Sequence, residues 1–275
     1  MIFCGKSFSL ELGKKTLVMG ILNVTPDSFY DGGKYNSKEN AIKRAKQILD
    51  EGGDLVDIGA QSTRPGHTPL TEEQELEIIK SYLPYIYNET GALISVDTFF
   101  PRVADYALAN GAVIVNDVSG KLNPDMAAVV KKHGAGWIIM HTGGGDADLL
   151  GEYGQDTVSS VDSFFTDALN FCADFDIRPE NILLDPGIGF GKTYEQNLKL
   201  IKSCNRFKNH GCGVLMALSS KRVLAQSSGA VGGDLVFPTI SADTVAVLFG
   251  ADMIRVHAVK ESVLAAKTAD AVISI

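Results

Sequence analysis

Eight short runs of apolar and β-branched residues, spread along the chain, constrain its fold more than any other feature. Each run spans four to six residues and is nearly continuous rather than alternating. Runs of this kind are typical of strands buried on both faces, as in a parallel sheet covered by helices. The sequence therefore predicts eight buried parallel strands. They begin at Leu17, Leu55, Leu93, Val113, Trp137, Ile182, Gly213 and Met253.

Between these runs lie segments with helical spacing and with residues that start or stop helices. Thr71 with Gln74, and Thr193 with Gln196, have the spacing of a capping box. Proline at a first turn and glycine after a last turn mark other helix boundaries. Starts are expected at Ser37, Pro101 and Pro124, and stops at Gly52, Gly53, Gly111 and Gly134.

A strand followed by a helix, repeated eight times without a linker rich in Pro, Gly or Ser, favours a closed (β/α)8 TIM barrel over an open doubly wound sheet. We expect residues 1–275 to form a single α/β barrel domain. The first residues, Met1 to Lys15, are expected to form a short hairpin that covers the bottom of the barrel.

Composition excludes several classes of protein. The formal net charge is −8 and no basic block is visible, so a nucleic-acid partner is disfavoured. No run of 18 apolar residues occurs, and the first residues lack the pattern of a signal peptide, so we expect no membrane partner and a cytoplasmic location. The four cysteines form no CxxC pair and are expected to be reduced.

Polar residues end almost every predicted strand. In an α/β barrel the loops after the strands converge at one face, where active sites form. Any single Asp or Asn there could instead cap the next helix, but eight such coincidences favour a site. The strand ends give Asn23, Asp57, Asp97, Asn116, Asp117, Met140, His141, Asp185, Ser219 to Arg222, Arg255 and His257.

These side chains divide by chemistry into two sets. One set suits the hydrogen-bonding edge of a flat heterocycle and consists of Asp97, Asn116, Asp185 and Lys221. The other suits a multiply charged anion such as diphosphate and consists of Asn23, Thr63, Arg64, Arg255 and His257. Strand alternation places Arg255 and His257 on one face. In the alternative reading, Arg255 pairs with a neighbouring carboxylate, and the ring of His257 is hydrogen-bonded within the core.

The segment "DPGIGFGKT" fails two nucleotide signatures. A P-loop needs glycine where Pro186 stands, and a dinucleotide fingerprint needs glycine where Lys192 stands. No HExxH or GxSxG motif is present, which disfavours zinc protease and serine hydrolase chemistry. We expect the glycines to let a loop pass close to a ligand, with Phe190 as a packing face. An ordinary glycine-rich turn is the alternative.

Six motifs in this order resemble those of the dihydropteroate synthases. They are "GILNVTPDSFYDGG", "STRPG", "SVDT", "NDVSG", "DPGIGFGKT" and "RVH", and they extend over nearly the whole chain. The resemblance implies a (β/α)8 barrel that condenses 6-hydroxymethyl-7,8-dihydropterin diphosphate with 4-aminobenzoate, releasing diphosphate. It also implies a homodimer and a bound Mg²⁺.

The resemblance further implies a role for each matching residue. Asp97, Asn116, Asp185 and Lys221 would bind the pterin, with Met140 and Phe190 packing near it. Asn23 would hold Mg²⁺, and Asn23, Thr63, Arg64, Arg255 and His257 would bind the diphosphate. The loop after the first strand would fold over the site with the "STRPG" loop, so that Phe29, Thr63, Pro65 and Arg222 form the aminobenzoate pocket. Asp31, Arg64 and Lys221 would be the catalytic residues.

The chain also departs from the family pattern near the site. Ser220 stands where arginine is usual, Gln61 where glutamate is usual, and Ala258 where aspartate is usual, while Thr142 to Gly145 replace a different loop sequence. Two alternatives therefore stay open. One is a pterin-binding barrel of the methyltransferase type, which would not need the anion pair. The other is a non-enzymatic paralogue that binds pterin.

Overall fold

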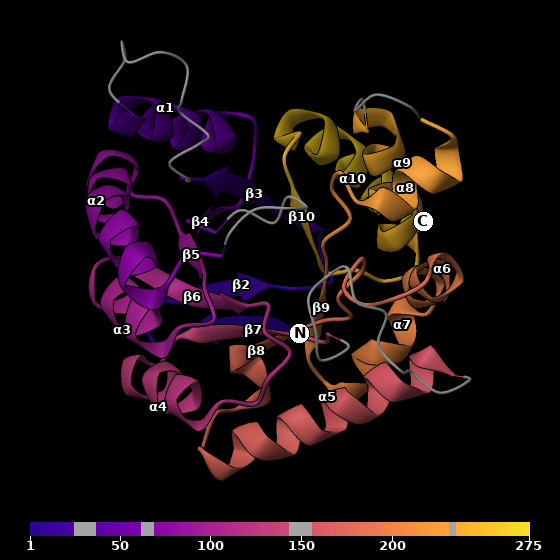
Figure 1. Cartoon of the computed structure of the whole chain (residues 1–275). Helices are drawn as coiled ribbons and strands as arrows, with labels where there is room; N and C mark the ends of the chain where they lie inside the picture. The colour runs from indigo at the N-terminus through magenta and orange to yellow at the C-terminus, as the bar shows by residue number, and fades with distance from the viewer. Residues whose placement is uncertain (25–36, 62–68, 143–155, 231–234) are drawn as a thin grey trace.

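The structure is a computed structural model that describes residues 1–24, 37–61, 69–142, 156–230 and 235–275. Its centre is a closed barrel of eight parallel strands in the order β10-β3-β4-β5-β6-β7-β8-β9 (Figure 1). The predicted barrel is confirmed. The strands are β3 (Leu17–Asn23), β4 (Leu55–Gly59), β5 (Ile94–Asp97), β6 (Ala112–Asp117), β7 (Gly136–Met140), β8 (Ile182–Asp185), β9 (Gly213–Met216) and β10 (Met253–Val256).

Helices surround the barrel (Figure 1). Both predicted capping boxes are present: Thr71 N–H donates to Gln74 Oε1 at 2.9 Å, and Thr193 N–H donates to Gln196 Oε1 at 2.8 Å. No helix in the described ranges is long and apolar enough to cross a membrane. The helices are α1 (Ser37–Asp50), α2 (Glu72–Thr90), α3 (Pro101–Ala109), α4 (Pro124–His133), α5 (Thr157–Asp174), α6 (Tyr194–Lys202), α7 (Cys204–Phe207), α8 (Arg222–Ser228), α9 (Val236–Leu248) and α10 (Val259–Ile273), with 3-10 turns at Pro179–Asn181 and Lys208–His210.

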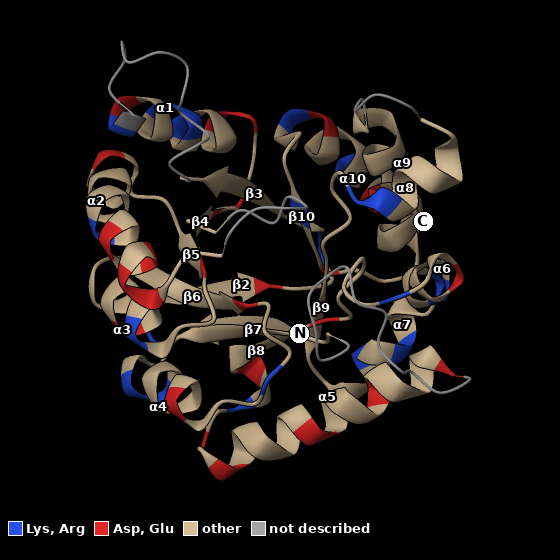
Figure 2. Ribbon diagram, viewed as in Figure 1, with Lys and Arg blue, Asp and Glu red and all other residues tan. Residues whose placement is uncertain are grey.

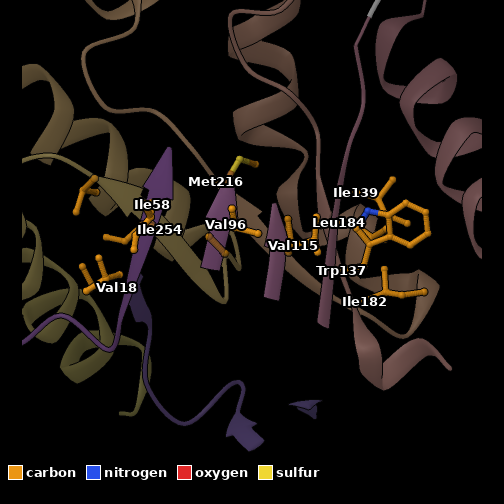
Figure 3. Packing of buried hydrophobic residues seen from close by; sticks show 14 of the residues in the cluster. Val18, Ile58, Val96, Val115, Trp137, Ile139, Ile182, Leu184, Met216 and Ile254 are labelled. Carbon is orange, nitrogen blue, oxygen red and sulfur yellow. The ribbon is translucent and has the colours of Figure 1, made fainter. Parts of the chain in front are cut away.

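Two hydrophobic layers follow from the alternation of side chains along each strand. Side chains that face outward pack against the helices, among them Val18, Ile58 and Val96 (Figure 3). Side chains that face inward fill the lower part of the barrel. This inner layer consists of Leu17, Met19, Leu55, Ile114, Ile138, Leu183, Leu215 and Met253.

The predicted N-terminal hairpin is present and packs against the inner layer. It consists of β1 (Ile2–Gly5) and β2 (Phe8–Glu11), paired antiparallel. Phe3 and Phe8 pack edge to face, with ring centroids 5.2 Å apart. A Cβ on Gly136 would lie 2.6 Å from the Phe3 ring, so a glycine at the start of β7 makes room for these rings. The hairpin thus covers the end of the barrel where the strands begin.

Candidate active site

Inward-facing side chains change from apolar to polar toward the ends of the strands. On β4, Leu55 is followed two residues later by Asp57, and on β10, Met253 is followed by Arg255. Because strand side chains alternate, each pair shares one face. Figure 2 shows most charged residues on the outer helices and a smaller group at the strands. The buried polar residues at the inner strand ends include Asp57, Ser95, Asn116 and Asp185, with Asp97 beside them.

Arg255 joins the two predicted sets of residues. Its Nε donates to Asp57 Oδ2 and its Nη2 donates to Asp97 Oδ2, each at 2.6 Å. Burial raises the pKa of Asp97 above its ordinary value, and the positive charge of Arg255 opposes that shift. The guanidinium assigned to the anion therefore also holds a carboxylate assigned to the ring. The alternative reading of Arg255, as the partner of a neighbouring carboxylate, describes its contacts in this structure.

Asp185 and Lys221 are near each other: Asp185 ends β8, and Lys221 precedes α8. Asp185 is buried, and its Oδ1 accepts the N–H of Gly187 at 2.7 Å. Burial raises the pKa of Asp185, whereas Gly187 and the nearby Lys221 lower it. The Lys221 ammonium is 4.2 Å from the centroid of the Phe190 ring. Burial lowers the pKa of Lys221 to about 8, against the opposing charge of Asp185.

The glycine-rich loop after β8 passes close to other protein groups, as its composition predicts. Gly187 has φ +67°, and a Cβ there would lie 1.9 Å from the His141 carbonyl oxygen. Gly189 has φ +83°, and a Cβ there would lie 3.1 Å from Lys221 Cδ. Glycine adopts these angles without the strain that a Cβ would add. The loop therefore brings Phe190 and Lys221 together.

Lys192 is a site-forming residue that sequence reasoning missed. It is almost fully buried, and its ammonium donates to the carbonyl oxygens of His141 at 3.1 Å, Gly187 at 2.8 Å and Phe190 at 3.1 Å. Burial lowers its pKa to about 7. Lys192 thus joins the loops after β7 and β8. The available signal is its place in a glycine-rich segment, where buried loop carbonyls need a donor.

His257, Asn23 and Arg222 are exposed at the rim of the site. His257 follows β10, and its Nδ1 lies 2.8 Å from the Oγ of Ser219, which also accepts the main-chain N–H of His257 at 3.2 Å. Arg44 donates to the His257 carbonyl oxygen at 2.7 Å. Asn23 ends β3, and Arg222 begins α8. Met140, by contrast, is buried beside Asp185 at the end of β7.

Five predicted residues lie outside the described residues, so their roles stay predictions. They are Phe29, Asp31, Thr63, Arg64 and Pro65.

Gln61, a departure from the family pattern, has a defined role in the structure. Its Nε2 donates to Glu75 Oε2 at 2.7 Å and to the Leu70 carbonyl at 3.2 Å, and its Oε1 accepts the Leu70 N–H at 3.0 Å. Glu75 is fully buried and also accepts from the Thr98 hydroxyl. Burial raises the pKa of Glu75. Gln61 thus donates a hydrogen bond to Glu75, whereas a glutamate at position 61 would place a second carboxylate beside it.

Gln61→Glu is expected to make stability depend on pH. The two touching carboxyls could not both ionise, so their folded pKa would rise above the unfolded value, and stability present in acid would be lost as pH rises. We expect little change at pH 5 and a loss of about 1–3 kcal/mol at pH 8, measured by urea unfolding. Gln47→Glu, a similar change beside the partly exposed Glu51, is the control. Equal losses at both pH values would contradict the explanation.

Among the other departures, the structure describes Ser220, Ala258 and Thr142. Ser220 has φ +59°, and its main-chain N–H donates to Thr239 Oγ1 at 3.2 Å, a contact that does not depend on the side chain. Ala258 is the N-cap of α10 and makes no side-chain cap, a role that aspartate performs well. Thr142 contacts the loop after β6, where a Cβ on Gly120 would lie 2.3 Å from Thr142 Cγ2. Gly143, Gly144 and Gly145 lie outside the described residues.

Comparison with known proteins defines the class to which this fold and site belong. The family model of pterin binding enzymes matches residues 19–257, and the chain belongs to that family. Its relatives there are dihydropteroate synthases: the protein of Bacillus subtilis is 38% identical over 98% of this chain and 93% of its own length, and that of Clostridium beijerinckii is 35% identical over 97% and 98%.

Solved structures agree. The dihydropteroate synthase of Clostridium difficile, crystallised in the presence of pteroic acid, has a TM-score of 0.89 and 37% identity, over 96% of this chain and 98% of that one. The enzyme of Xanthomonas albilineans with 4-aminobenzoic acid has a TM-score of 0.91 and 34% identity, over 100% and 98%. A complex of the Xanthomonas albilineans enzyme with 7,8-dihydropteroate has a TM-score of 0.89 and 31% identity, over 100% of both chains.

Proposed function

We propose that this chain is a dihydropteroate synthase, a transferase of folate biosynthesis. It condenses 6-hydroxymethyl-7,8-dihydropterin diphosphate with 4-aminobenzoate to give 7,8-dihydropteroate and diphosphate. The observation that carries the proposal is the polar layer at the barrel mouth, where ring-binding groups and the guanidinium of Arg255 are in direct contact. The nearly full-length relatives support the same reaction.

The pterin would bind to the buried side of this layer. Asp97, Asn116 and Asp185 present oxygen acceptors, and Lys221 presents a donor, which matches a ring edge with both N–H groups and acceptor atoms. Met140 and Phe190 supply apolar contact for the ring faces. Because the site is buried, each hydrogen bond here discriminates strongly against a ring that lacks the matching group.

The diphosphate would lie toward the rim, near Asn23, Arg255 and His257. In the reaction the bond between the pterin methylene carbon and the diphosphate oxygen breaks, and the oxygen keeps the electron pair. The amine nitrogen of 4-aminobenzoate forms a bond to that carbon and then loses a proton. Fixed cations at the departing oxygen lower the barrier because negative charge develops there.

Asn23 would hold Mg²⁺ together with the diphosphate. Asn23, at the end of β3, offers one amide oxygen to a metal ion. No group of three His, Cys, Asp or Glu side chains suited to a metal is found in the described ranges. That donor set fits Mg²⁺, which is often bound by few protein ligands with substrate phosphates and water. The ion would neutralise charge on the diphosphate.

We assign the aminobenzoate pocket to Phe29, Thr63, Pro65 and Arg222, and a catalytic contribution to Asp31 and Arg64, on the family resemblance. Arg222, which is exposed at the start of α8, is the member within the described residues.

A release assay tests the proposal. The chain, with Mg²⁺ and 6-hydroxymethyl-7,8-dihydropterin diphosphate, is expected to release diphosphate in a manner that requires 4-aminobenzoate, with 7,8-dihydropteroate formed in equal amount. Pterin binding without amine-dependent release would instead support the non-enzymatic paralogue. Transfer of a methyl group would support the methyltransferase barrel.

We further propose a homodimer formed through α9 and α10, which lie side by side (Figure 1). Phe237 on α9 is 74% exposed, and Leu248 on α9 and Leu264 on α10 are also exposed. A second copy of the chain would cover these apolar side chains. Light scattering should show a dimer, and Leu248→Glu with Leu264→Glu should give a monomer. A monomeric wild type would contradict the proposal.

We also propose a cytoplasmic location. Cys4, Cys172, Cys204 and Cys212 are all free thiols, and the last three are buried. A reducing compartment keeps such cysteines unpaired.

A further inference from the structure

Asp57 is a buried carboxylate to which the sequence assigns no role beyond its place at a strand end. Its exposed fraction is 0%, and it lies on β4, with Asn23 on the neighbouring strand β3 and Asp97 on the neighbouring strand β5. Its Oδ2 accepts from Arg255 Nε at 2.6 Å and from Asn116 Nδ2 at 3.2 Å. These partners belong to β10 and β6, so a single oxygen links strands on different sides of β4.

The contact with Asn116 fixes the direction of an amide. With Nδ2 donating to Asp57, Asn116 presents its Oδ1 as an acceptor. This Oδ1 is buried and has no hydrogen-bond partner among the described residues. A buried acceptor is normally satisfied, so an unpaired one in a site indicates a ligand donor.

The contact with Arg255 fixes the direction of a guanidinium. Asp57 takes the Nε–H and Asp97 takes a hydrogen of Nη2. A guanidinium held by two carboxylates has few rotamers left, so its remaining N–H groups are directed before any anion arrives. Preorganised donors of this kind are the most effective at stabilising the negative charge that develops in the transition state.

We propose that Asp57 is a positioning residue that orients, through one carboxylate oxygen, both the Asn116 acceptor and the Arg255 donors. The inference rests on the proposed function, because it assigns the ring to Asn116 and the diphosphate to Arg255. Asp57 acts through these two residues and does not itself touch either substrate. The orientation of Asn116 in the ring-binding half of the site therefore depends on the same oxygen as the orientation of Arg255 in the diphosphate-binding half.

A double-mutant cycle tests this role. Asp57→Ala, Asn116→Ala and the double variant are titrated by calorimetry with 6-hydroxymethylpterin, which lacks phosphates, and separately with Mg²⁺ and inorganic diphosphate. Asp57→Ala is expected to weaken pterin binding about tenfold in the wild-type background. In the Asn116→Ala background it is expected to cost less than about twofold, because its effect passes through Asn116. Diphosphate binding should weaken in both backgrounds.

Asp57→Asn is the matched control. An asparagine can keep an oxygen at the Oδ2 position and place its amide nitrogen at the Oδ1 position, which has no partner among the described residues. Pterin binding should therefore stay within about threefold of wild type. Diphosphate binding should fall, because one of the two carboxylates that hold Arg255 becomes a neutral amide and its charged hydrogen bond to Nε weakens. If Asp57→Ala does not fold, Asp57→Ser replaces it in the cycle, since its hydroxyl is too short to reach both partners.

Equal losses of pterin affinity in both backgrounds would overturn the inference, because Asp57 would then act on the ring directly or through general stability. Unchanged diphosphate affinity in Asp57→Ala would also overturn it. A wild type that binds neither pterin nor diphosphate would instead refute the proposed function.

Discussion

Arg255→Ala is expected to abolish amine-dependent diphosphate release and to lower the free energy of unfolding by about 3–5 kcal/mol. The change removes the cation that lies 2.6 Å from both Asp57 and Asp97. Two carboxylates would then face each other in a buried layer without a compensating charge. The free energy is measured by chemical unfolding, and the activity by the release assay.

The loss of stability in Arg255→Ala should depend on pH. Burial already raises the pKa of Asp97, and removal of Arg255, which lowers it, would raise it further. A carboxyl with a raised folded pKa contributes stability below its unfolded pKa that is lost as pH rises. The deficit should therefore be small near pH 4 and largest above pH 7. A variant as stable as wild type at pH 8 would contradict the ion-pair explanation.

Arg255→Lys separates charge from geometry. An ammonium restores a positive charge but cannot donate along two fixed directions to Asp57 and Asp97. We expect most of the stability to return and most of the diphosphate affinity to remain lost. Because Arg255 also holds Asp97, binding of a pterin without phosphates should weaken in the alanine variant, but less than binding of diphosphate.

The barrel could be predicted from sequence because its determinants are local. Buried strands such as "LVDIG" and "WIIM" are continuous apolar runs, and Thr71 and Thr193 form their caps with residues only three positions away. The predicted hairpin at Met1 to Lys15 is also present, although the packing of Phe3 and Phe8 against the inner layer is known only from the structure. The strand and cap signals involve only residues that are close together in the sequence.

The connections within the site could not be predicted because they join distant residues. Asp57 and Arg255 are 198 positions apart, and Asp57 and Asn116 are 59 apart, so no local pattern pairs them. Sequence reasoning identified Arg255 and Asn116 as ligand-binding residues but gave Asp57 no function. Lys192 was missed for a similar reason, since its three carbonyl partners come from two loops.

Lys221→Met is expected to lower kcat/KM by about 100-fold. The substitution keeps an apolar stem of similar length beside the Phe190 ring but removes the ammonium. The charged hydrogen bond that this ammonium would donate to the pterin is worth about 1.5–3 kcal/mol. It also leaves the buried Asp185 without the nearby positive charge that lowers its pKa. Lys199→Met, at an exposed position of α6, is the control and should retain full activity.

The pH profile of kcat/KM identifies the protonation state that Lys221 needs. Burial lowers its pKa to about 8, so the ammonium is present below that pH and is lost above it. Since kcat/KM reports groups of the free enzyme, the wild-type profile should fall as pH rises through about 8. Lys221→Met should lack this descending limb, whereas Lys199→Met should retain it. A limb that persists unchanged in Lys221→Met would assign the titration to another group and remove the argument that a charged Lys221 binds the ring.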